Sequence, residues 1–502
     1  MVEHKNKIME KKPEHSSDGS MSKKYQCFGI RHLQIACMCF TTISLFIARS
    51  SMGVAVLAMA GEGRKNDTQS SVPVYEWDKK TQSLILSSFF WGYVTMQIPA
   101  GLLAKKFGGK IILLVALVVN GALCSLLPAL AALGGWPLVC MARVAMGLSQ
   151  ACLFPASHTL FGQWLPPREM TSFSGIVAGG AQLGTIIAMP VSGVLAESEL
   201  GWKVIFYTMS GLLFFNAAIW YWFSASSPGE HRMISTEERQ YIENGLNSTG
   251  GQRSMPTPWK QILTTVPLWA ILATHIGSSM SFVLFFVDMP TYLEKGLQIS
   301  LKNSASLSAL PYIGMWIGIV TSSVVAEKLT NKEVISKGTC RKIFNSLGMF
   351  GITGGLVILS FLGPESKSLA VAALVGTLTM SGFCSAGFVV NFLDMSPNFA
   401  GVLLSLTNFV ANFGCVLMPI ITSFILRNDS SDVSRWRIVF LMTAAITAGT
   451  NIIYVLFSSS ELQPWNDPDY FDKAKADPEE MRPVFTEQEL NNKEKENKAA
   501  KH

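Results

Sequence analysis

The 502-residue chain carries little charge for its length. Lys, Arg, Asp and Glu make up 15% of it, whereas hydrophobic residues make up 49%. A soluble globular protein usually contains about 25% charged residues. The charged residues gather near the two ends, and long apolar stretches lie between them. This shortage excludes a set of soluble domains and predicts a membrane protein.

Several chemical signatures are also missing. The nine cysteines contain no CxxC pair, so we expect neither a disulfide framework nor a zinc site. Walker A, HExxH and GxSxG sequences do not occur, which argues against ATP-driven pumping and hydrolysis. We therefore expect no enzyme activity and no cofactor. The net charge of +6 forms no basic stripe interleaved with aromatic residues, so no nucleic acid partner is expected.

Twelve mostly apolar stretches are present, and each is at least as long as the roughly 20 residues needed to cross a bilayer. They predict an all-α membrane protein with twelve transmembrane helices in two halves of six. The expected spans lie near 33–60, 81–103, 111–132, 137–161, 171–196, 204–225, 265–290, 303–326, 343–363, 368–391, 399–426 and 437–458.

Five regions follow from this division. They are an N-terminal arm (1–32), a first six-helix half (33–225), a central loop (226–264), a second half (265–458) and a C-terminal tail (459–502). Seven Lys and Arg residues precede residue 33, which favours a cytosolic arm and therefore a cytosolic central loop and tail.

The chain contains three N-glycosylation sequons. Asn66 and Asn428 fall in loops predicted to lie outside, so both are expected to be glycosylated. The sequon at Asn247 falls in the predicted cytosolic loop and should remain unmodified.

Two short patterns recur in corresponding spans. AQLG at 181–184 is matched by ANFG at 411–414, and WKVIF at 202–206 is matched by WRIVF at 436–440. Each second copy follows about 230 residues after the first, which indicates a duplicated six-helix unit. Both halves begin on the same side, as in major facilitator transporters, whose substrate site lies at the midplane between them.

Ionisable side chains inside spans are costly and are therefore candidates for function. Arg49 lies deep in the first span and Arg143 in the fourth, and the planar guanidinium group suits a carboxylate or phosphate. The alternative for either is a structural arginine bonded to nearby carbonyls. Gln182 and Asn412, from the repeated patterns, are expected to line the same cavity.

Three further residues are candidates for coupling or gating. His158 and His275 lie within spans and can titrate near neutral pH, although both suit a packing role as well. Asp288 is the best-placed carboxylate, near the outer end of span 7. Spans 1 to 4 contain no Asp or Glu, so the interior is positive and favours an anionic substrate.

Several motifs resemble the anion:cation symporter family, which includes sialin, the vesicular glutamate transporters and the type I sodium–phosphate cotransporters. SFFWGY at 88–93 and QIPAG at 97–101 are similar to its span 2 signature. Phe154-Pro155, His158 and WLPP at 164–167 are similar to its span 4 exit. Further matches in spans 10 and 11 are Asn391, Asp394, Pro397, Ala400-Gly401 and Asn408.

The resemblance covers roughly residues 33–465 and implies roles for three residues. Arg49 corresponds to the family's span 1 arginine, which is linked to anion recognition. Arg143 matches a span 4 arginine, and His158 matches a family histidine.

The departures from the family pattern concern coupling and substrate. Met146 and Gln150 stand where sialin-like members have two glutamates tied to proton coupling. Leu86 and Ser278 replace a histidine and an arginine of the vesicular glutamate transporters. The remaining branch resembles the inorganic phosphate cotransporters of insects.

The leading hypothesis is therefore a secondary active symporter that moves inorganic phosphate or a small organic anion by alternating access, with Na⁺ favoured over H⁺. A proton-coupled or electrogenic organic-anion carrier that uses His158 or His275 is the main alternative. An anion channel or a non-transporting sensor is the remote one. We expect the protein to work as a monomer in the lipid bilayer, in the plasma membrane rather than a vesicular or lysosomal membrane.

Overall fold

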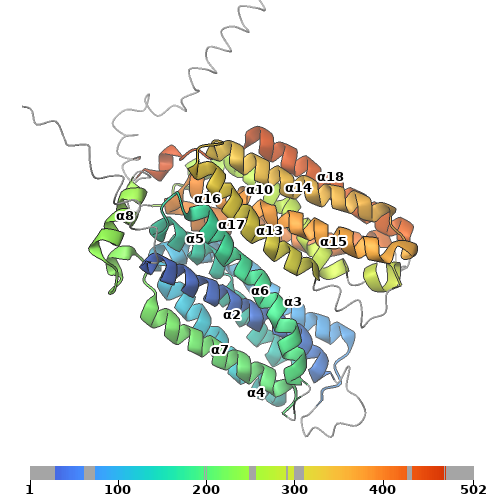
Figure 1. The fold of residues 1–502 in the computed structure, drawn as a ribbon. Coiled ribbons are helices and arrows are strands. Elements are labelled where there is room, and N and C mark those ends of the chain that lie inside the picture. Colours follow the sequence, from blue (N-terminus) through green and yellow to red (C-terminus); the bar gives the residue numbers. More distant parts are fainter. Residues whose placement is uncertain are drawn as a thin grey trace, which may run out of the picture.

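The computed structural model describes residues 29–60, 74–196, 198, 200–247, 256–289, 292–298, 310–426, 432–467 and 470. Within these ranges the chain is helical and contains no strand. Hydrocarbon offers no water to backbone N–H and C=O groups, and a helix satisfies these groups within its own segment. The long helices lie side by side in two bundles (Figure 1).

The first bundle holds the helices of the N-terminal half. They are α2 (Ile30–Met59), α3 (Lys79–Phe107), α4 (Gly109–Gln150), α5 (Leu153–Trp164), α6 (Met170–Ala196) and α7 (Trp202–Phe223). Between the halves lie a 3-10 turn, η1 (Pro228–Glu230), and two short helices, α8 (Thr236–Asn247) and α9 (Trp259–Thr264).

The second bundle holds the C-terminal half. Its helices are α10 (Val266–Val283), α13 (Leu310–Asn331), α14 (Lys337–Phe361), α15 (Lys367–Ser381), α16 (Phe388–Met395), α17 (Ala400–Leu426) and α18 (Val433–Phe457). Short π or 3-10 turns accompany them: η2 (Leu284–Asp288), η3 (Tyr292–Gly296), η4 (Pro364–Ser366), η5 (Gly382–Ala386), η6 (Pro397–Phe399) and η7 (Pro464–Asn466).

Helix α4 is two membrane crossings joined at a sharp break. Gly135 has φ 61° and ψ −149°, outside the helical region. On either side of it, Asn120 donates hydrogen bonds to Ser149 and accepts one from Gln150. Residues equally far from Gly135 therefore meet, which shows that the chain folds back there. The predicted spans near 111–132 and 137–161 are the two arms of this hairpin.

Ten segments of the described chain are long and apolar enough to cross a membrane. One of them, Gly109–Trp164, supplies two crossings because of the break at Gly135. Helix α3 carries more polar residues and supplies the remaining crossing. The predicted fold of six helices followed by six helices is confirmed.

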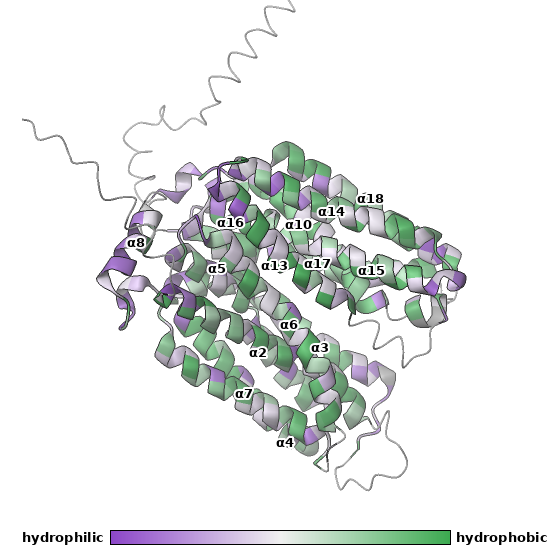
Figure 2. Cartoon of the chain, viewed as in Figure 1, coloured by the Kyte–Doolittle hydropathy of each residue, from purple (hydrophilic) through white to green (hydrophobic). Residues whose placement is uncertain are grey.

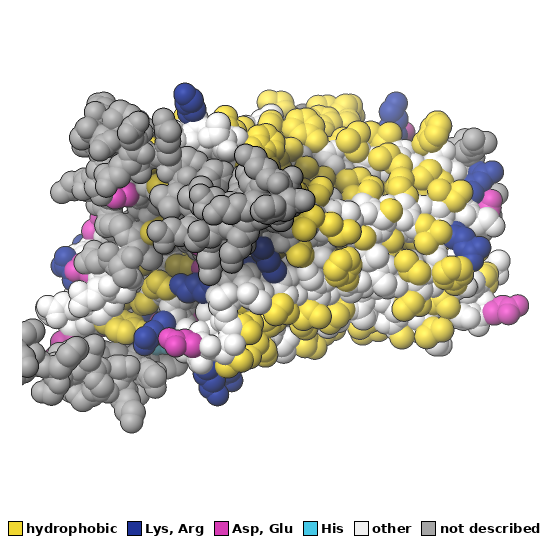
Figure 3. All heavy atoms as spheres, turned by 90° about the horizontal axis from the view of Figure 1, so that it is seen from above, with side chains coloured by type: hydrophobic (Ala, Val, Ile, Leu, Met, Phe, Trp, Pro, Cys, Tyr) yellow, Lys and Arg dark blue, Asp and Glu magenta, His cyan; other side chains and the backbone are white. Residues whose placement is uncertain are grey.

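The surface of the molecule is typical of a membrane protein. Hydrophobic residues predominate along the bundle helices, and hydrophilic residues gather at the helix ends and on α8 (Figure 2). In the space-filling view, hydrophobic side chains cover much of the visible face, and charged side chains lie mostly toward its two ends (Figure 3).

The two halves repeat the same neighbour relations. Helix α6 packs on α2 as α17 packs on α10, and α4 packs on α7 as α14 packs on α18. The repeated sequence patterns explain part of this similarity. A Cβ at Gly184 would lie 2.6 Å from the carbonyl oxygen of Ile43 on α2, and one at Gly414 would lie 3.0 Å from Met280 on α10. Both glycines permit the same close helix approach.

The second repeated pattern begins the last helix of each half. Trp202 contacts Phe206 with ring centroids 5.9 Å apart, and Trp436 contacts Phe440 at 5.8 Å. Both tryptophans are buried. The recurring WKVIF and WRIVF sequences thus place the same aromatic pair at equivalent positions.

Helix α8 lies against one end of the bundles, which we call the α8 end (Figure 1). Its residue Glu238 accepts hydrogen bonds from the first two backbone N–H groups of α2, those of Ile30 at 3.0 Å and Arg31 at 3.1 Å. These groups have no partner within the helix, and the carboxylate also matches the positive end of the helix dipole.

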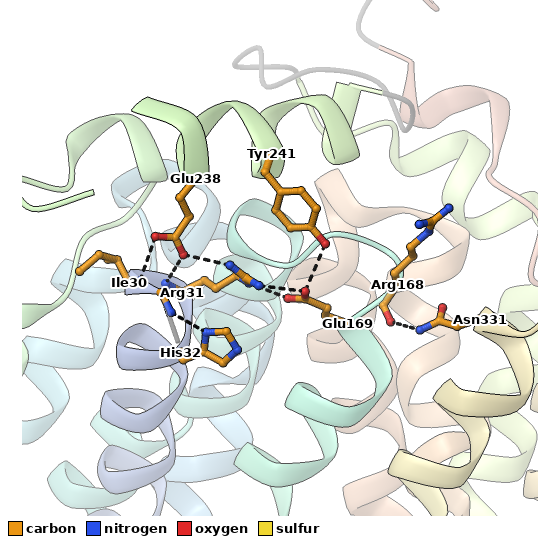
Figure 4. A network of polar contacts seen from close by, with 9 residues as sticks. Ile30, Arg31, His32, Arg168, Glu169, Glu238, Tyr241 and Asn331 are labelled. Atoms are coloured by element: carbon orange, nitrogen blue, oxygen red, sulfur yellow. Dashed lines mark hydrogen bonds and ion pairs between the residues drawn. The ribbon is translucent and has the colours of Figure 1, made fainter. Parts of the chain in front are cut away.

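Arg31 links α8 to the segment before α6 (Figure 4). Its buried guanidinium pairs with Glu169 at 2.8 Å and with Glu238 at 3.2 Å. Burial raises the pKa of Tyr241, whose hydroxyl stays protonated and donates to Glu169 at 3.2 Å. One cation and two carboxylates thus fasten α8 to the first half.

The two halves also meet at the α8 end. Glu327 of α13 accepts a hydrogen bond from the backbone N–H of Ser172 at 2.8 Å, and Asn331 donates to the carbonyl of Arg168 at 2.6 Å. Arg341 of α14 pairs with Asp394 at 2.6 Å and donates to Thr171 at 2.9 Å. The segment around Glu169 is therefore held from both sides, and the α8 end is closed.

A close backbone approach at this end generates a prediction. Alanine at Gly162 would place its Cβ 2.6 Å from the carbonyl oxygen of Pro397, a contact between the halves. Gly162→Ala should therefore disfavour the closed α8 end. A cysteine introduced at Ser405, which is buried on α17, should react several-fold faster with an impermeant thiol reagent applied from the α8 side.

The control for this experiment is Gly211→Ala. A Cβ at Gly211, in α7, meets no atom within 4 Å, so labelling should equal that of the parent. Both variants are made in a background without other reactive cysteines. Equal labelling in the Gly162 and Gly211 variants would contradict the prediction.

Candidate functional site

Two arginines share one aromatic ring inside the first half. The guanidinium carbon of Arg49 on α2 lies 4.7 Å from the ring centroid of Phe89, and that of Arg143 on α4 lies 4.8 Å from it. Arg49 also lies near the rings of Phe46, Phe90 and Tyr93, at 5.4, 5.1 and 5.2 Å. The negative faces of these rings attract a cation.

Neither arginine has an acidic partner in the part of the chain that the structure describes. Arg143 is 3% exposed, and its Nε and Nη1 make no hydrogen bond there. The positive charge of Arg49 acts on it unfavourably. Burying an unpaired charge is expensive. The described surroundings therefore leave two positive forks whose donors suit an oxyanion.

Both arginines lie well inside their helices. Arg49 follows the first residue of α2 by 19 positions, or about 28 Å of helix, and about 15 Å of helix remains beyond it. Arg143 lies about 12 Å of helix beyond the break at Gly135. The sequence prediction that Arg49 lies deep in its span agrees with this placement.

Ring contacts followed by hydrogen bonds connect the arginines to the second half. The ring of Tyr93 stacks on Phe89 with centroids 6.0 Å apart, beside Arg49. Asn408 of α17 donates to Gln97 at 3.0 Å and to the Tyr93 hydroxyl at 3.5 Å. Sequence reasoning quoted these residues only as family motifs and did not place them at the site. The available signal was that Phe89, Tyr93 and Gln97 follow one another at intervals of four residues on α3.

Gln182 and Asn412 occupy equivalent helices of the two halves. Asn412 is half-buried and donates to the carbonyl of Asn408 in its own helix at 2.7 Å. Gln182 is half-buried on α6. Neither side chain hydrogen-bonds Arg49 or Arg143, so their role in lining the cavity remains a prediction.

The two candidate histidines lie together, apart from the arginines. His158 on α5 and His275 on α10 each have a ring centroid 6.5 Å from that of Phe392 on α16. Nδ1 of His158 lies 3.1 Å from the carbonyl of Phe154, and Nδ1 of His275 lies 3.2 Å from the hydroxyl of Thr407. His158 is about 22 Å of helix from Arg143, toward the α8 end.

Gln150 and Met146 have structural contacts. Gln150 donates to Asn120 at 2.8 Å across the α4 hairpin, and Met146 is 1% exposed in the core. Both positions therefore hold uncharged side chains, whereas a carboxyl group there would change its charge with pH. Asn66 and Asn428 lie outside the described residues, so glycosylation remains a prediction.

Comparisons with known proteins agree with this architecture. Residues 38–419 match the family model described as Major Facilitator Superfamily. The chain is 37% identical to human sialin over 392 residues, covering 78% of each protein. It is 33% identical over 464 residues to the Drosophila melanogaster protein named "Putative inorganic phosphate cotransporter", covering 88% of each.

The chain belongs to the major facilitator superfamily. Within the superfamily it belongs to the anion:cation symporter group, because its relatives also include human vesicular glutamate transporter 2, at 32% identity over 88% of this chain and 77% of that protein. The family resemblance seen in the sequence motifs is confirmed. These proteins are transporters of anions, and the family is not one of enzymes.

Solved structures show the same fold. The proton:xylose symporter XylE aligns with a TM-score of 0.63 at 13% identity, covering 86% of this chain and 98% of that one. The E. coli fucose:proton symporter FucP aligns with a TM-score of 0.59 at 15% identity, covering 86% of this chain and 99% of that one. In the major facilitator arrangement the substrate site lies between the halves. The contacts that lead from Phe89 through Tyr93 to Asn408 lie in this region.

The shared ring generates a prediction for this transporter. Phe89→Leu keeps an apolar side chain but removes both cation–π contacts, each worth about 0.5–2 kcal/mol. The two contacts together are worth about 1–4 kcal/mol, so the apparent KM for the transported anion should rise at least about fivefold at unchanged surface expression. Phe90→Leu is the comparison, since Phe90 is 41% exposed and, of the two arginines, its ring lies near Arg49 and not Arg143. Its effect should be smaller, and a normal KM in Phe89→Leu would refute the role of the ring.

Proposed function

We propose that the protein is a sodium-coupled symporter of a small anion, with inorganic phosphate as the first candidate and a small organic anion as the second. The observation that carries the proposal is the pair of guanidinium groups on Phe89, without an acidic partner among the described residues. Such an arrangement stabilises negative charge and repels cationic substrates.

The compactness of the pair favours phosphate. Both guanidinium groups lie under 5 Å from the same ring centroid, so the positive charge is concentrated in a small region. A phosphate offers several oxygens and can accept hydrogen bonds from two forks at once. A monocarboxylate offers two oxygens, which one fork can satisfy.

The lack of acidic residues in spans 1 to 4 supports coupling to sodium. Spans 1 to 4 contain no Asp or Glu, and Gln150 is engaged with Asn120. A proton symporter needs a side chain that binds and releases a proton during each cycle. The observation that favours the proton alternative is the placement of His158 and His275 against Phe392, between the two halves.

The contacts between the halves suit alternating access. In the described chain, the hydrogen bonds that join the halves lie from the level of Tyr93 to the α8 end. Rocking of one half against the other would break these contacts and open the α8 end around a fixed central site. We place the transporter in the plasma membrane, as a monomer with its α8 end in the cytosol.

Uptake of radiolabelled phosphate tests the proposal. Cells that express the protein should take up phosphate saturably in sodium medium and much less when choline replaces sodium. Arg49→Ala should lose at least about 90% of this uptake, because one of two charge-assisted contacts is removed. Arg239→Ala, on the exposed face of α8, is the matched control and should keep normal uptake.

Surface expression of each variant is measured in parallel. Equal uptake in sodium and choline media would refute sodium coupling. Currents that persist without any cation gradient and do not saturate would indicate a channel instead.

The proton alternative has its own test. If the histidines carried protons, the double variant His158→Gln and His275→Gln would lose the dependence of uptake on external pH. We expect the double variant to keep the sodium dependence and the pH profile of the parent. A flattened pH profile at normal surface expression would favour proton coupling.

A further inference from the structure

Asp288 is a carboxylate at the end of the seventh span that lies away from α8. It ends the π-helical turn η2, Leu284–Asp288, which continues α10. It follows the first residue of α10 by 22 positions, or about 33 Å of helix from the α8 end. Its buried Oδ2 atom makes no hydrogen bond in the described structure. This position is near the end of the span, but a buried carboxyl oxygen normally has a hydrogen-bond partner there too.

The group that faces Asp288 is a second oxygen without a hydrogen bond. Thr422 of α17 is 2% exposed, and its hydroxyl group lies beside the Asp288 carboxyl group. Even so, its Oγ1 has no hydrogen-bond partner among the described residues. Two oxygen atoms from two helices therefore lie beside each other, and neither has a hydrogen bond of ordinary geometry among the described residues. Buried polar atoms normally have one, so an exception calls for an explanation.

The backbone beside Asp288 is also unusual. In η2 the hydrogen bonds run from residue i+5 to residue i, so that the N–H of Met289 donates to the carbonyl of Leu284. Such turns are wider than an α-helix and are frequent at functional sites. In secondary transporters, irregular helical backbone near the substrate site supplies carbonyl oxygens to Na⁺.

The equivalent position in the first half has no carboxylate on the neighbouring helix α2. Ser192 of α6 corresponds to Thr422 by the AQLG and ANFG repeat, and its hydroxyl is also buried and unpaired in the described structure. However, its neighbour α2 contains no Asp or Glu. The carboxylate is therefore not a requirement of the duplicated fold, and it distinguishes the second half.

We propose that Asp288 and Thr422 form a binding site for Na⁺, with carbonyl oxygens of the η2 turn completing its oxygen ligands. One carboxylate neutralises one monovalent charge, so the occupied site is electrically neutral. Ca²⁺ and Mg²⁺ are held by more charged or more regular oxygen sets. The inference rests on the proposed function, because it names the place where the coupling ion binds.

Helix α17 connects this site to the surroundings of the anion-binding arginines. Helix α17 carries both Thr422 and Asn408, and Asn408 bonds to Gln97 and Tyr93 beside Arg49. A cation that joins α10 to α17 would fix the position of α17 and therefore of Asn408. Occupancy of the cation site would thus favour one arrangement of the halves around the anion.

Sodium binding to the purified full-length protein tests the proposal without any transported anion. The measurement is saturable binding of radioactive ²²Na⁺ at pH 7.5 in choline gluconate of constant ionic strength. Asp288→Asn should weaken binding at least about tenfold. Thr422→Val should weaken it several-fold, because one ligand is lost. Ser192→Ala is the matched control and should bind as the parent does.

A second reading separates this inference from the proposed function. Arg239→Ala, on the exposed face of α8, should bind ²²Na⁺ normally, because the cation site does not include it. If the parent transports no phosphate but loses ²²Na⁺ binding on Asp288→Asn, the cation site stands and the proposed substrate is wrong. If sodium drives phosphate uptake while Asp288→Asn and Thr422→Val bind ²²Na⁺ normally, the site is wrong and the proposed function stands.

Two further outcomes overturn the inference. One is a parent protein that does not bind ²²Na⁺. The other is a parent whose melting temperature is insensitive to sodium, rises between pH 7.5 and 5.5, and loses that rise on Asp288→Asn. The second result would make Asp288 a proton site. Should Asp288→Asn fail to fold, the comparison of Thr422→Val with Ser192→Ala decides the question.

Discussion

The energetic constraint on this protein is the cost of holding two guanidinium groups in an apolar interior. In water each would be solvated, and in a folded interior each would usually be paired with a carboxylate. Here Arg49 and Arg143 lie against Phe89, whose ring faces compensate part of the charge. Because two like charges also repel, the arrangement favours any state in which an anion lies between or beside them. This dependence on an anion is what a transporter uses.

The rest of the structure determines when an anion can reach the two arginines. Phe89 and Tyr93 lie on α3, which packs against α17 of the other half, and Asn408 bonds across this contact. Farther toward the α8 end, Glu327, Asn331 and Arg341 fasten the second half to the segment that precedes and begins α6. On its other side the same segment is fastened through Glu169 to Arg31. A short stretch of chain thus connects α8, the first half and the second half.

The duplicated architecture makes the differences between the halves informative. Equivalent glycines bring α6 to α2 and α17 to α10, and equivalent tryptophans begin α7 and α18. Against this background, the arginines lie only on the first-half side of the site described here. Asp288 belongs to the second half and has no acidic counterpart on α2. We infer that the two halves bind different ions, the first mainly the anion and the second the cation.

The membrane class, the number of spans, the duplication and the family could all be predicted from the amino-acid sequence. These follow from local properties, since a run of apolar residues and a repeated motif are visible without knowing any contact. It also singled out Arg49, Arg143 and Asp288, because an ionisable residue in an apolar run is conspicuous. It did not reveal that one phenyl ring serves both arginines, that Asn408 joins them to the other half, or that Arg31 and Arg341 are closing contacts at the α8 end. The paired residues are far apart in the chain, as Tyr93 is from Asn408 and Asp288 from Thr422. Only the packing of one helix on another decides which of their side chains meet.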